Sequence, residues 1–333
     1  MLHTPLCDLL GIHHPLLNAP MGGTAAADLA AAVSGAGGFG MIGGTSRGGA
    51  DWLRTQIRSV RDRTDRPFGV GFISSFPGTE DLVQVALDER VAAINHSFAD
   101  PAPYVAAAHA RQVRVFAQVQ SVAQAVHAAR AGIDLIIAQG TEGGGHTGTT
   151  GTLALVPAVV DAVGDVPVVA AGGIADGRGL AAALLLGAVG AWLGTRFVAS
   201  LEWGGKDWEQ RAVLAASADD TIRTTAFDRV RQAPFPEGIE DRVLRNAFTE
   251  AWHGRGAELD ARREELALAL KAAARTGDAT MTDVSAGVAA GLIQSLEPAA
   301  VIVRRIVAEA ERALRAWSGT EPMRPLPQQA TRE

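Results

Sequence analysis

The sequence predicts a (β/α)8 TIM barrel, an α/β fold, followed by a C-terminal helical cap. The first observation is an alternation of short apolar runs and helical segments, repeated eight times between about residue 16 and residue 200. The second is that these runs are almost continuously apolar, as in parallel strands that are covered on both faces. Eight such units close a barrel. A doubly wound open sheet is the alternative, but no Gly-x-Gly-x-x-Gly motif follows the first strand.

The expected elements follow one another as strand, loop and helix. The strands are expected at 16–18, 39–42, 68–73, 91–95, 113–118, 134–138, 166–171 and 188–193, and the helices between them at 28–34, 51–61, 79–88, 103–109, 121–131, 152–163 and 177–186. We divide the chain into a barrel of residues 1–200 and a cap of residues 201–318 on the barrel mouth. Beyond Ser200 the pattern predicts helices only, at 207–216, 242–252, 258–274 and 297–317, and residues 319–333 are expected to fray.

Composition excludes several classes of protein. The net charge is −6 and no basic run with aromatic residues occurs, which argues against nucleic-acid binding. The single cysteine, Cys7, rules out an internal disulfide framework and lies far from every glycine loop. The run 179–195 is short, rich in Ala and Gly and interrupted by glycines, so we expect no membrane segment. The amino terminus lacks the pattern of a signal peptide, and a cytoplasmic location is expected.

The loop 139–148, Gln-Gly-Thr-Glu-Gly-Gly-Gly-His-Thr-Gly, holds the strongest candidate for catalysis. It follows the sixth expected strand, and the carboxyl ends of barrel strands carry the active site. Its glycines let the backbone pass close to a ligand and leave Gln139, Glu142 and His146 as nearly the only polar side chains able to act there. An unperturbed imidazole has a pKa of about 6.5, which suits a general base. A flexible turn with a surface histidine is the alternative reading.

Two further glycine-containing loops end the seventh and eighth expected strands, at Gly172-Gly173 and at Gly194-Thr195. In barrels of this class these two loops commonly bind phosphate, because free backbone N–H groups converge there. No second nucleotide fingerprint is visible, so the pattern predicts one monophosphate. A plain helix-start turn is the alternative for a single Gly-Gly pair.

The remaining polar residues give weaker signals. The segment 18–23, Asn-Ala-Pro-Met-Gly-Gly, ends the first strand and offers close backbone approach and the soft side chain of Met21. His96 follows the fourth strand, where a structural role is the favoured reading. Glu142 and His146 are four residues apart, but the glycines between them disfavour a helix, so no metal site is expected.

These motifs, together with Ala-Ala-Gly-Gly-Ile-Ala-Asp-Gly at 170–177 and Gly-Thr-Arg-Phe at 194–197, resemble the nitronate monooxygenase family from about residue 10 to residue 310. The resemblance implies an FMN-dependent barrel that oxidises alkyl nitronates with dioxygen to a carbonyl compound and nitrite. It implies that His146 is the catalytic residue. The residues implied to surround the flavin are Ala19, Pro20, Met21, Gly22, Gly71, Gln139, Gly144, Gly172, Gly173, Trp192, Leu193, Gly194 and Thr195.

Two positions depart from the family pattern. Family members commonly have Gln where this chain has Asn18, and Asn where it has Gly71. Both positions are expected to border the flavin, so the second departure removes one candidate hydrogen bond to its ring.

Two other functions fit the same motifs. A flavin-dependent enoyl-acyl-carrier-protein reductase resembles this family in fold and in its Gly-Gly-His motif, and it uses NAD(P)H and an acidic carrier protein. A barrel that binds a phosphate ligand without catalysis is the non-enzyme alternative, although such a loop has no need of His146. The expected partners are a small-molecule nitronate and dioxygen, and the sequence leaves the oligomeric state open, a homodimer included.

Overall fold

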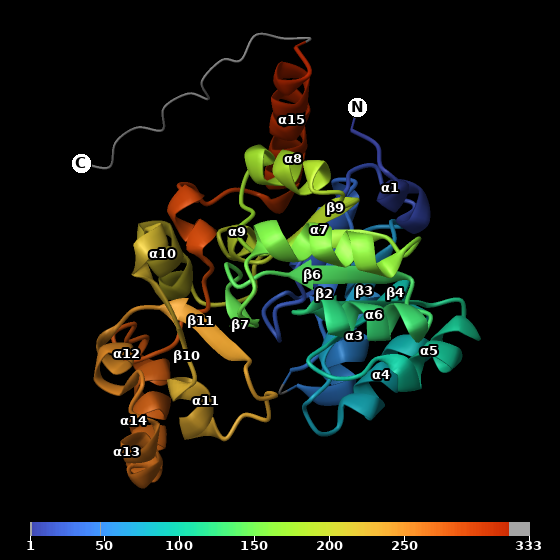
Figure 1. Cartoon of the computed structure of the whole chain (residues 1–333). Helices are drawn as coiled ribbons and strands as arrows, with labels where there is room; N and C mark the ends of the chain where they lie inside the picture. Colours follow the sequence, from blue (N-terminus) through green and yellow to red (C-terminus); the bar gives the residue numbers. More distant parts are fainter. Residues whose placement is uncertain (1, 47, 320–333) are drawn as a thin grey trace.

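The computed structural model describes residues 2–46 and 48–319, and its centre is an eight-stranded parallel sheet (Figure 1). Its strand order is β1-β9-β8-β6-β5-β4-β3-β2, so consecutive units are neighbours. The predicted (β/α)8 architecture is confirmed. The strands are β1 (Leu16–Asn18), β2 (Gly40–Gly43), β3 (Phe68–Ile73), β4 (Ala93–Ser97), β5 (Arg114–Val119), β6 (Leu135–Gln139), β8 (Val168–Ala171) and β9 (Gly190–Leu193).

The barrel closes between β1 and β2, where a regular ladder is missing. Only one bridge joins the backbones here, between Leu17 and Phe39. The fully buried side chain of Asn18 adds two further hydrogen bonds between these strands. Its Nδ2 donates to the carbonyl of Met41 (2.8 Å), and its Oδ1 accepts from the N–H of the same residue (2.8 Å). Asn18 therefore connects β1 to β2 and has a structural function.

Seven helices connect the strands along the outside of the sheet. α4 and α7 have the bounds predicted from the sequence, and the other five differ by one or two residues at an end, as helix ends often do. The helices are α2 (Ala27–Gly35), α3 (Gly49–Arg61), α4 (Thr79–Asp88), α5 (Ala102–His109), α6 (Val122–Arg130), α7 (Thr152–Val163) and α8 (Gly177–Leu185), and α1 (Pro5–Leu10) precedes β1.

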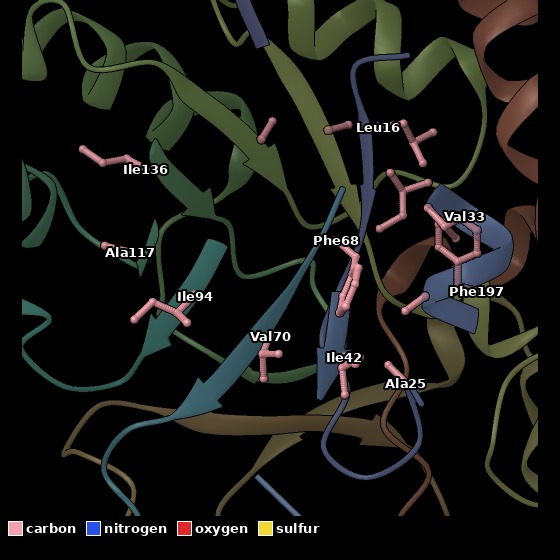
Figure 2. Packing of buried hydrophobic residues seen from close by; sticks show 14 of the residues in the cluster. Leu16, Ala25, Val33, Ile42, Phe68, Val70, Ile94, Ala117, Ile136 and Phe197 are labelled. Carbon is pink, nitrogen blue, oxygen red and sulfur yellow. The ribbon is translucent and has the colours of Figure 1, made fainter. Parts of the chain in front are cut away.

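Alternate residues of each strand fill two separate cores. Leu16, Val70 and Ile94 point outward and pack against the helices, in the layer that Figure 2 shows. Leu17 and Trp192 belong to the second cluster, in the barrel interior, which also contains the free thiol Cys7 of α1. This period of two explains why the strands read as continuously apolar.

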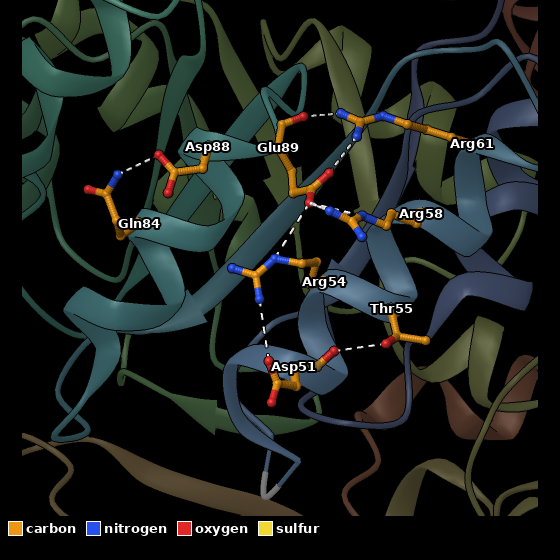
Figure 3. A network of polar contacts seen from close by, with 8 residues as sticks. All are labelled: Asp51, Arg54, Thr55, Arg58, Arg61, Gln84, Asp88 and Glu89. Carbon is orange, nitrogen blue, oxygen red and sulfur yellow. Dashed lines mark hydrogen bonds and ion pairs between the residues drawn. The ribbon is translucent and has the colours of Figure 1, made fainter.

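A polar network on the outer surface ties α3 to the end of α4 (Figure 3). The Glu89 carboxylate, which is only 12% exposed, accepts from Arg58 (2.8 Å) and Arg61 (2.9 Å) of α3. Arg54 lies next to the same carboxylate (3.6 Å). The network holds two neighbouring helices of the barrel and lies outside the cavities described below.

The region after Ser200 differs from the prediction, because it contains strands as well as helices. β10 (Thr221–Thr224) and β11 (Glu240–Leu244) pair antiparallel, and β11 also pairs with β7 (Gly145–Thr147) of the glycine-rich loop. These strands are too short for an alternating pattern to emerge from sequence alone. The short helix α9 (Thr195–Val198) follows β9. The helices after Ser200 are α10 (Asp207–Ala215), α11 (Ala226–Arg231), α12 (Ala247–Trp252), α13 (Gly256–Ala261) and α14 (Arg263–Thr276), with 3-10 turns η1 (Ala218–Asp220) and η2 (Val288–Leu292).

The last helix, α15 (Ala299–Trp317), returns to the outside of the barrel and packs against α8 (Figure 1). It also contacts α2. The buried guanidinium of Arg196, after β9, anchors its start by an ion pair with Glu297 (2.7 Å). The division into residues 1–200 and 201–318 stays a prediction. The tail that was expected to fray, residues 319–333, lies outside the described residues after Gly319. Within the described ranges, no helix is both long and apolar enough to cross a membrane.

Candidate active site

His146 is held at the mouth of the barrel by a strand pairing. It lies in β7, at the end of the glycine-rich loop that follows β6, and its register partner in β11 is Asp241. Gly144 allows this arrangement, since a Cβ at that position would meet the backbone N of Gly287 at 2.5 Å. The polypeptide after Ser200 therefore holds the glycine-rich loop in place. In the structure this loop is part of a small sheet and is not a free turn.

Asp228 of α11 is the direct partner of the imidazole. Nε2 of His146 lies 2.9 Å and 3.1 Å from the two carboxylate oxygens, and both side chains are mostly buried. An ionised carboxylate only accepts hydrogen bonds, so Nε2 is the nitrogen that carries the proton. Nδ1 of the neutral ring is then left with a free lone pair. The pair has the arrangement of a carboxylate-oriented general base.

Three phenylalanines surround this imidazole. The ring of Phe235 stacks on His146 with centroids 3.4 Å apart, and Phe98 approaches its edge at 6.1 Å. Phe76 contacts Phe235 edge to face at 5.3 Å. All four residues line the same cavity, so one side of the imidazole has an aromatic surrounding.

Glu142, the other acidic residue of the loop, has a structural partner. Its carboxylate accepts from the backbone N–H of Thr152 (2.8 Å) and from its hydroxyl (2.8 Å). Thr152 begins α7, whose free N–H groups and dipole favour a negative charge. Glu142 therefore holds the loop to α7 and is not free for proton transfer.

A chain of amides crosses the cavity floor. The Asn95 amide donates to Ser97 (3.0 Å), Ser97 donates to Gln118 (2.9 Å), and Gln118 donates to the side-chain oxygen of Gln139 (2.6 Å). Gln120 donates to that same oxygen (3.0 Å). With its oxygen occupied twice, Gln139 keeps its Nε2 hydrogens as donors for a ligand.

Two adjoining cavities receive the sequence-predicted residues. The larger has a volume of about 1730 Å³ and the smaller of about 70 Å³. The smaller lies between the two glycine loops that were predicted to bind phosphate. Ala19, Pro20, Met21, Gly22, Gln139, Gly144, His146, Gly194 and Thr195 line the larger cavity, and Gly172, Gly173 and Trp192 line the smaller.

Gly71 and Leu193 line neither cavity. A Cβ at Gly71 would meet the ring of Pro20 at 2.2 Å, so glycine is needed there for packing and an Asn would not fit without rearrangement. Leu193 is buried in the core between the sheet and the helices. Asn18, the other departure from the family pattern, uses its side-chain amide for the two hydrogen bonds to Met41.

His96 is a structural histidine. It stacks on Tyr104 of α5 with centroids 4.2 Å apart, and its Nδ1 lies 2.8 Å from the Ser74 hydroxyl. Burial lowers its pKa to about 4, so the ring stays neutral. It lines neither cavity, which agrees with the favoured reading of the sequence.

Two more acidic residues lie near the base. Burial raises the pKa of Asp241 to about 6, and the neighbouring charges of His146, Asp283 and Asp228 contribute smaller shifts. Asp283 itself forms a two-point ion pair with Arg231 (2.5 and 2.6 Å). Within the described ranges, no group of three or more His, Cys, Asp and Glu side chains has the arrangement of a metal site.

Sequence reasoning missed Asp228 and Phe235. Both lie in the region predicted to form a helical cap, more than 80 residues after His146, and neither belongs to a recognisable motif. The signal that was available is weak: Gln-Ala-Pro-Phe-Pro, residues 232–236, is a proline-flanked aromatic in a loop, and such residues often serve in binding.

The chain is similar to several known proteins. The model of the family described as "Nitronate monooxygenase" matches residues 3–82 and 73–309. A CoA dehydrogenase of Mycobacterium tuberculosis, which acts on a hydroxy-methyl-oxo-octahydroindene-carboxyl-CoA, is 38% identical over 75% of this chain and 68% of its own. Nitronate monooxygenase npaC of Metarhizium robertsii is 37% identical over 87% and 88% of the two chains. The structure of FabK from Thermotoga maritima has a TM-score of 0.87 and 36% identity, covering 96% of this chain and 100% of that one.

An eight-stranded barrel with glycine loops after β8 and β9 and a carboxylate-oriented histidine at its mouth is typical of one class, the cofactor-dependent barrel oxidoreductases. Within that class, the chain belongs to the nitronate monooxygenase family and is a flavin-dependent oxidoreductase.

Proposed function

We propose that this chain oxidises alkyl nitronates with dioxygen, giving a carbonyl compound and nitrite, with FMN as its cofactor. The observation that carries the proposal is the pairing of Asp228 with Nε2 of His146 inside the larger cavity. A nitronate is already an anion and needs only to be positioned. A neutral nitroalkane must first lose its α-proton, and Nδ1 of His146 is the atom we assign to receive it.

The residues present fit a flavin monophosphate. A Cβ at Gly194 would meet only the Cβ of Ala19, at 3.5 Å, so the surface of this loop is open toward the cavity. Gly172 and Gly173 have φ values of +100° and +74°, a region that side chains other than glycine rarely adopt. We assign the phosphate to these two loops and a ring contact to the Gln139 amide. FMN when bound supplies the electron acceptor of the reaction.

The protein's own residues supply the rest. Gln139 orients the ligand through Nε2, because Gln118 and Gln120 hold its oxygen. Phe98 and Phe235 exclude water from the imidazole, and Asp228 keeps the ring in one tautomer and stabilises the cation that forms when Nδ1 takes a proton. Each of these functions exists before the substrate binds, which is the basis of preorganised catalysis.

The proposal is tested by turnover without a nicotinamide. The purified protein, incubated in air with ethylnitronate, is expected to consume oxygen and release nitrite. Flavin released by heat is expected to migrate as FMN on chromatography. Recovery of FAD would contradict the cofactor assignment, and the absence of nitrite from every nitronate tried would contradict the reaction.

A second candidate is the FMN-dependent reduction of an enoyl thioester by NAD(P)H. The structural likeness to FabK and the sequence likeness to a CoA dehydrogenase support it. Rapid NAD(P)H oxidation that depends on an enoyl thioester, together with no nitrite, would favour this candidate. For the compartment we propose the cytoplasm, and for the assembly a homodimer, which sedimentation of the purified protein would test.

A further inference from the structure

The larger cavity extends well beyond the barrel mouth. Its volume of about 1730 Å³ exceeds the roughly 300–1,000 Å³ of most small-molecule sites. One side of it is formed by the barrel loops and His146. The opposite side is formed by α10, α14 and the segment before α10. A cofactor and a small nitronate would occupy the barrel side, which leaves the outer side for another ligand.

One face of α14 forms the outer wall. The residues that line the cavity recur at helical spacing, which places them on a single stripe. Leu266, one turn away from the stripe's centre, is buried instead in the core of the surrounding helices. The stripe consists of Ala267, Leu268, Lys271, Ala274 and Arg275, and the mostly buried Leu270 at its edge also lines the cavity.

This wall carries positively charged side chains. Within residues 2–46 and 48–319, Lys271 and Arg275 form no ion pair. Lys206 reaches the same place, because its Nζ donates to the carbonyl of Ala274 (2.7 Å), which adjoins Arg275 in the chain. Three cations thus surround the end of α14.

Within the described ranges, none of the acidic residues that line the cavity forms an ion pair with Lys271 or Arg275. Asp283 is paired with Arg231, and Asp228 with His146. Glu209 accepts the backbone N–H of Lys206 (2.8 Å). Asp241 is buried, and its carboxylate accepts from the Ser285 hydroxyl (3.3 Å).

Two indole groups of the same wall lack partners. Nε1 of Trp203 and Nε1 of Trp208 are buried, and neither finds an acceptor within the described part of the chain. Both tryptophans line the larger cavity. Beside the cations, the stripe exposes Leu268, which is 70% exposed. The wall therefore combines anion-binding groups with apolar surface.

We propose that the outer side of this cavity is a second binding site, for a ligand with a phosphate or pyrophosphate end and a longer, less polar arm that reaches toward His146. Lys271 and Arg275 hold the anionic end and Lys206 supports it. Charge-assisted contacts from Lys and Arg are the usual means of phosphate recognition. A coenzyme A thioester and a reduced nicotinamide dinucleotide share this chemistry.

The test measures binding without turnover, so it is independent of the proposed reaction. The full-length protein with its bound cofactor is titrated calorimetrically with coenzyme A, with NADPH and with pantetheine, which lacks the phosphates. At least one phosphate-bearing compound is expected to bind, more tightly than pantetheine and more weakly as salt is added. Binding of coenzyme A alone would identify an acyl carrier, and binding of NADPH alone a hydride donor.

The double variant Lys271→Gln, Arg275→Gln is expected to weaken this binding about tenfold or more, the effect of losing even one charge-assisted contact, while cofactor content stays unchanged. The matched control is Arg304→Gln, Arg312→Gln on α15, which removes the same charge from residues that do not line the cavity. Three results would overturn the proposal: no binding of either phosphate compound, binding of pantetheine as tight as that of the phosphate compound that binds, or equal losses in the double variant and its control.

Discussion

Asp228 accepts a hydrogen bond from Nε2 of His146 at 2.9 Å, although 82 residues separate them in the chain. The contact forms because β11 pairs with β7 and brings the region after Ser200 onto the glycine-rich loop. His146, the base we propose, and the carboxylate that orients it therefore come from different parts of the molecule.

The first prediction concerns this contact. Asp228→Asn replaces an acceptor by an amide that can also donate, so the imidazole is no longer held in one tautomer. We expect turnover of neutral nitroethane to fall by about 10²–10⁴, the usual share of an oriented base, while cofactor binding is unchanged. Nitrogen NMR of the labelled imidazole should show a mixture of tautomers. Asp260→Asn, which removes the partner of Arg229 elsewhere, is the control; an unaltered imidazole spectrum in the Asp228 variant would refute the assignment.

The second prediction concerns His146 itself. His146→Asn is expected to suppress turnover of nitroethane by about 10²–10⁴, whereas ethylnitronate turnover suffers less because no carbon proton has to be removed. The ratio of the two losses is the quantity to measure, by nitrite release at saturating substrate. Equal losses on both substrates would assign His146 to positioning instead of proton transfer.

The third prediction tests the phosphate loop. Gly194→Val places a side chain into open cavity space, and φ at this position is −100°, which any residue adopts. The barrel is therefore expected to fold normally while FMN affinity falls at least about tenfold, or about 1.4 kcal/mol. Flavin absorbance per protein and circular dichroism measure the two effects. Gly35→Val on α2, where a Cβ has no neighbour within 4 Å, is the control, and full FMN retention in the Gly194 variant would disprove the phosphate assignment.

The fourth prediction is a pH dependence of stability. Burial raises the pKa of Asp241 from 3.8 to about 6 in the folded protein. Between these values the unfolded chain has lost the proton and the folded chain retains it, so this residue lowers stability as pH rises. Asp241→Asn is expected to stabilise the protein by up to about 3 kcal/mol at about pH 8, and by little at about pH 4. Urea unfolding at both pH values measures this, and an equal effect at the two would rule it out.

Sequence reasoning was sufficient for the barrel because each strand is a short apolar run and each helix has its own period. The glycines at 172, 173 and 194 were recognisable for the same reason, since their place after the seventh and eighth strands is a local property. Asp228 could not be found in this way. Its position depends on the pairing of β11 with β7, and that pairing is long-range and only three residues long.

Asn18 and Gly71, the two departures from the family pattern, show a second limit of sequence reasoning. From the sequence both were expected to border the flavin. In the structure the amide of Asn18 joins β1 to β2, and Gly71 makes room for Pro20. The amides that face the cavity from the strands are those of Gln118 in β5 and Gln139 in β6. A substitution judged against a family pattern is therefore interpretable only once its neighbours are known.

The central claim is that a nitronate, and not a nicotinamide, reduces the bound flavin. It is tested most directly by mixing the purified protein anaerobically with ethylnitronate or with NADPH and following the flavin absorbance. We predict rapid bleaching by ethylnitronate and at most slow bleaching by NADPH. Rapid bleaching by NADPH, with none by any nitronate tried, would contradict the account and assign the chain to thioester reduction.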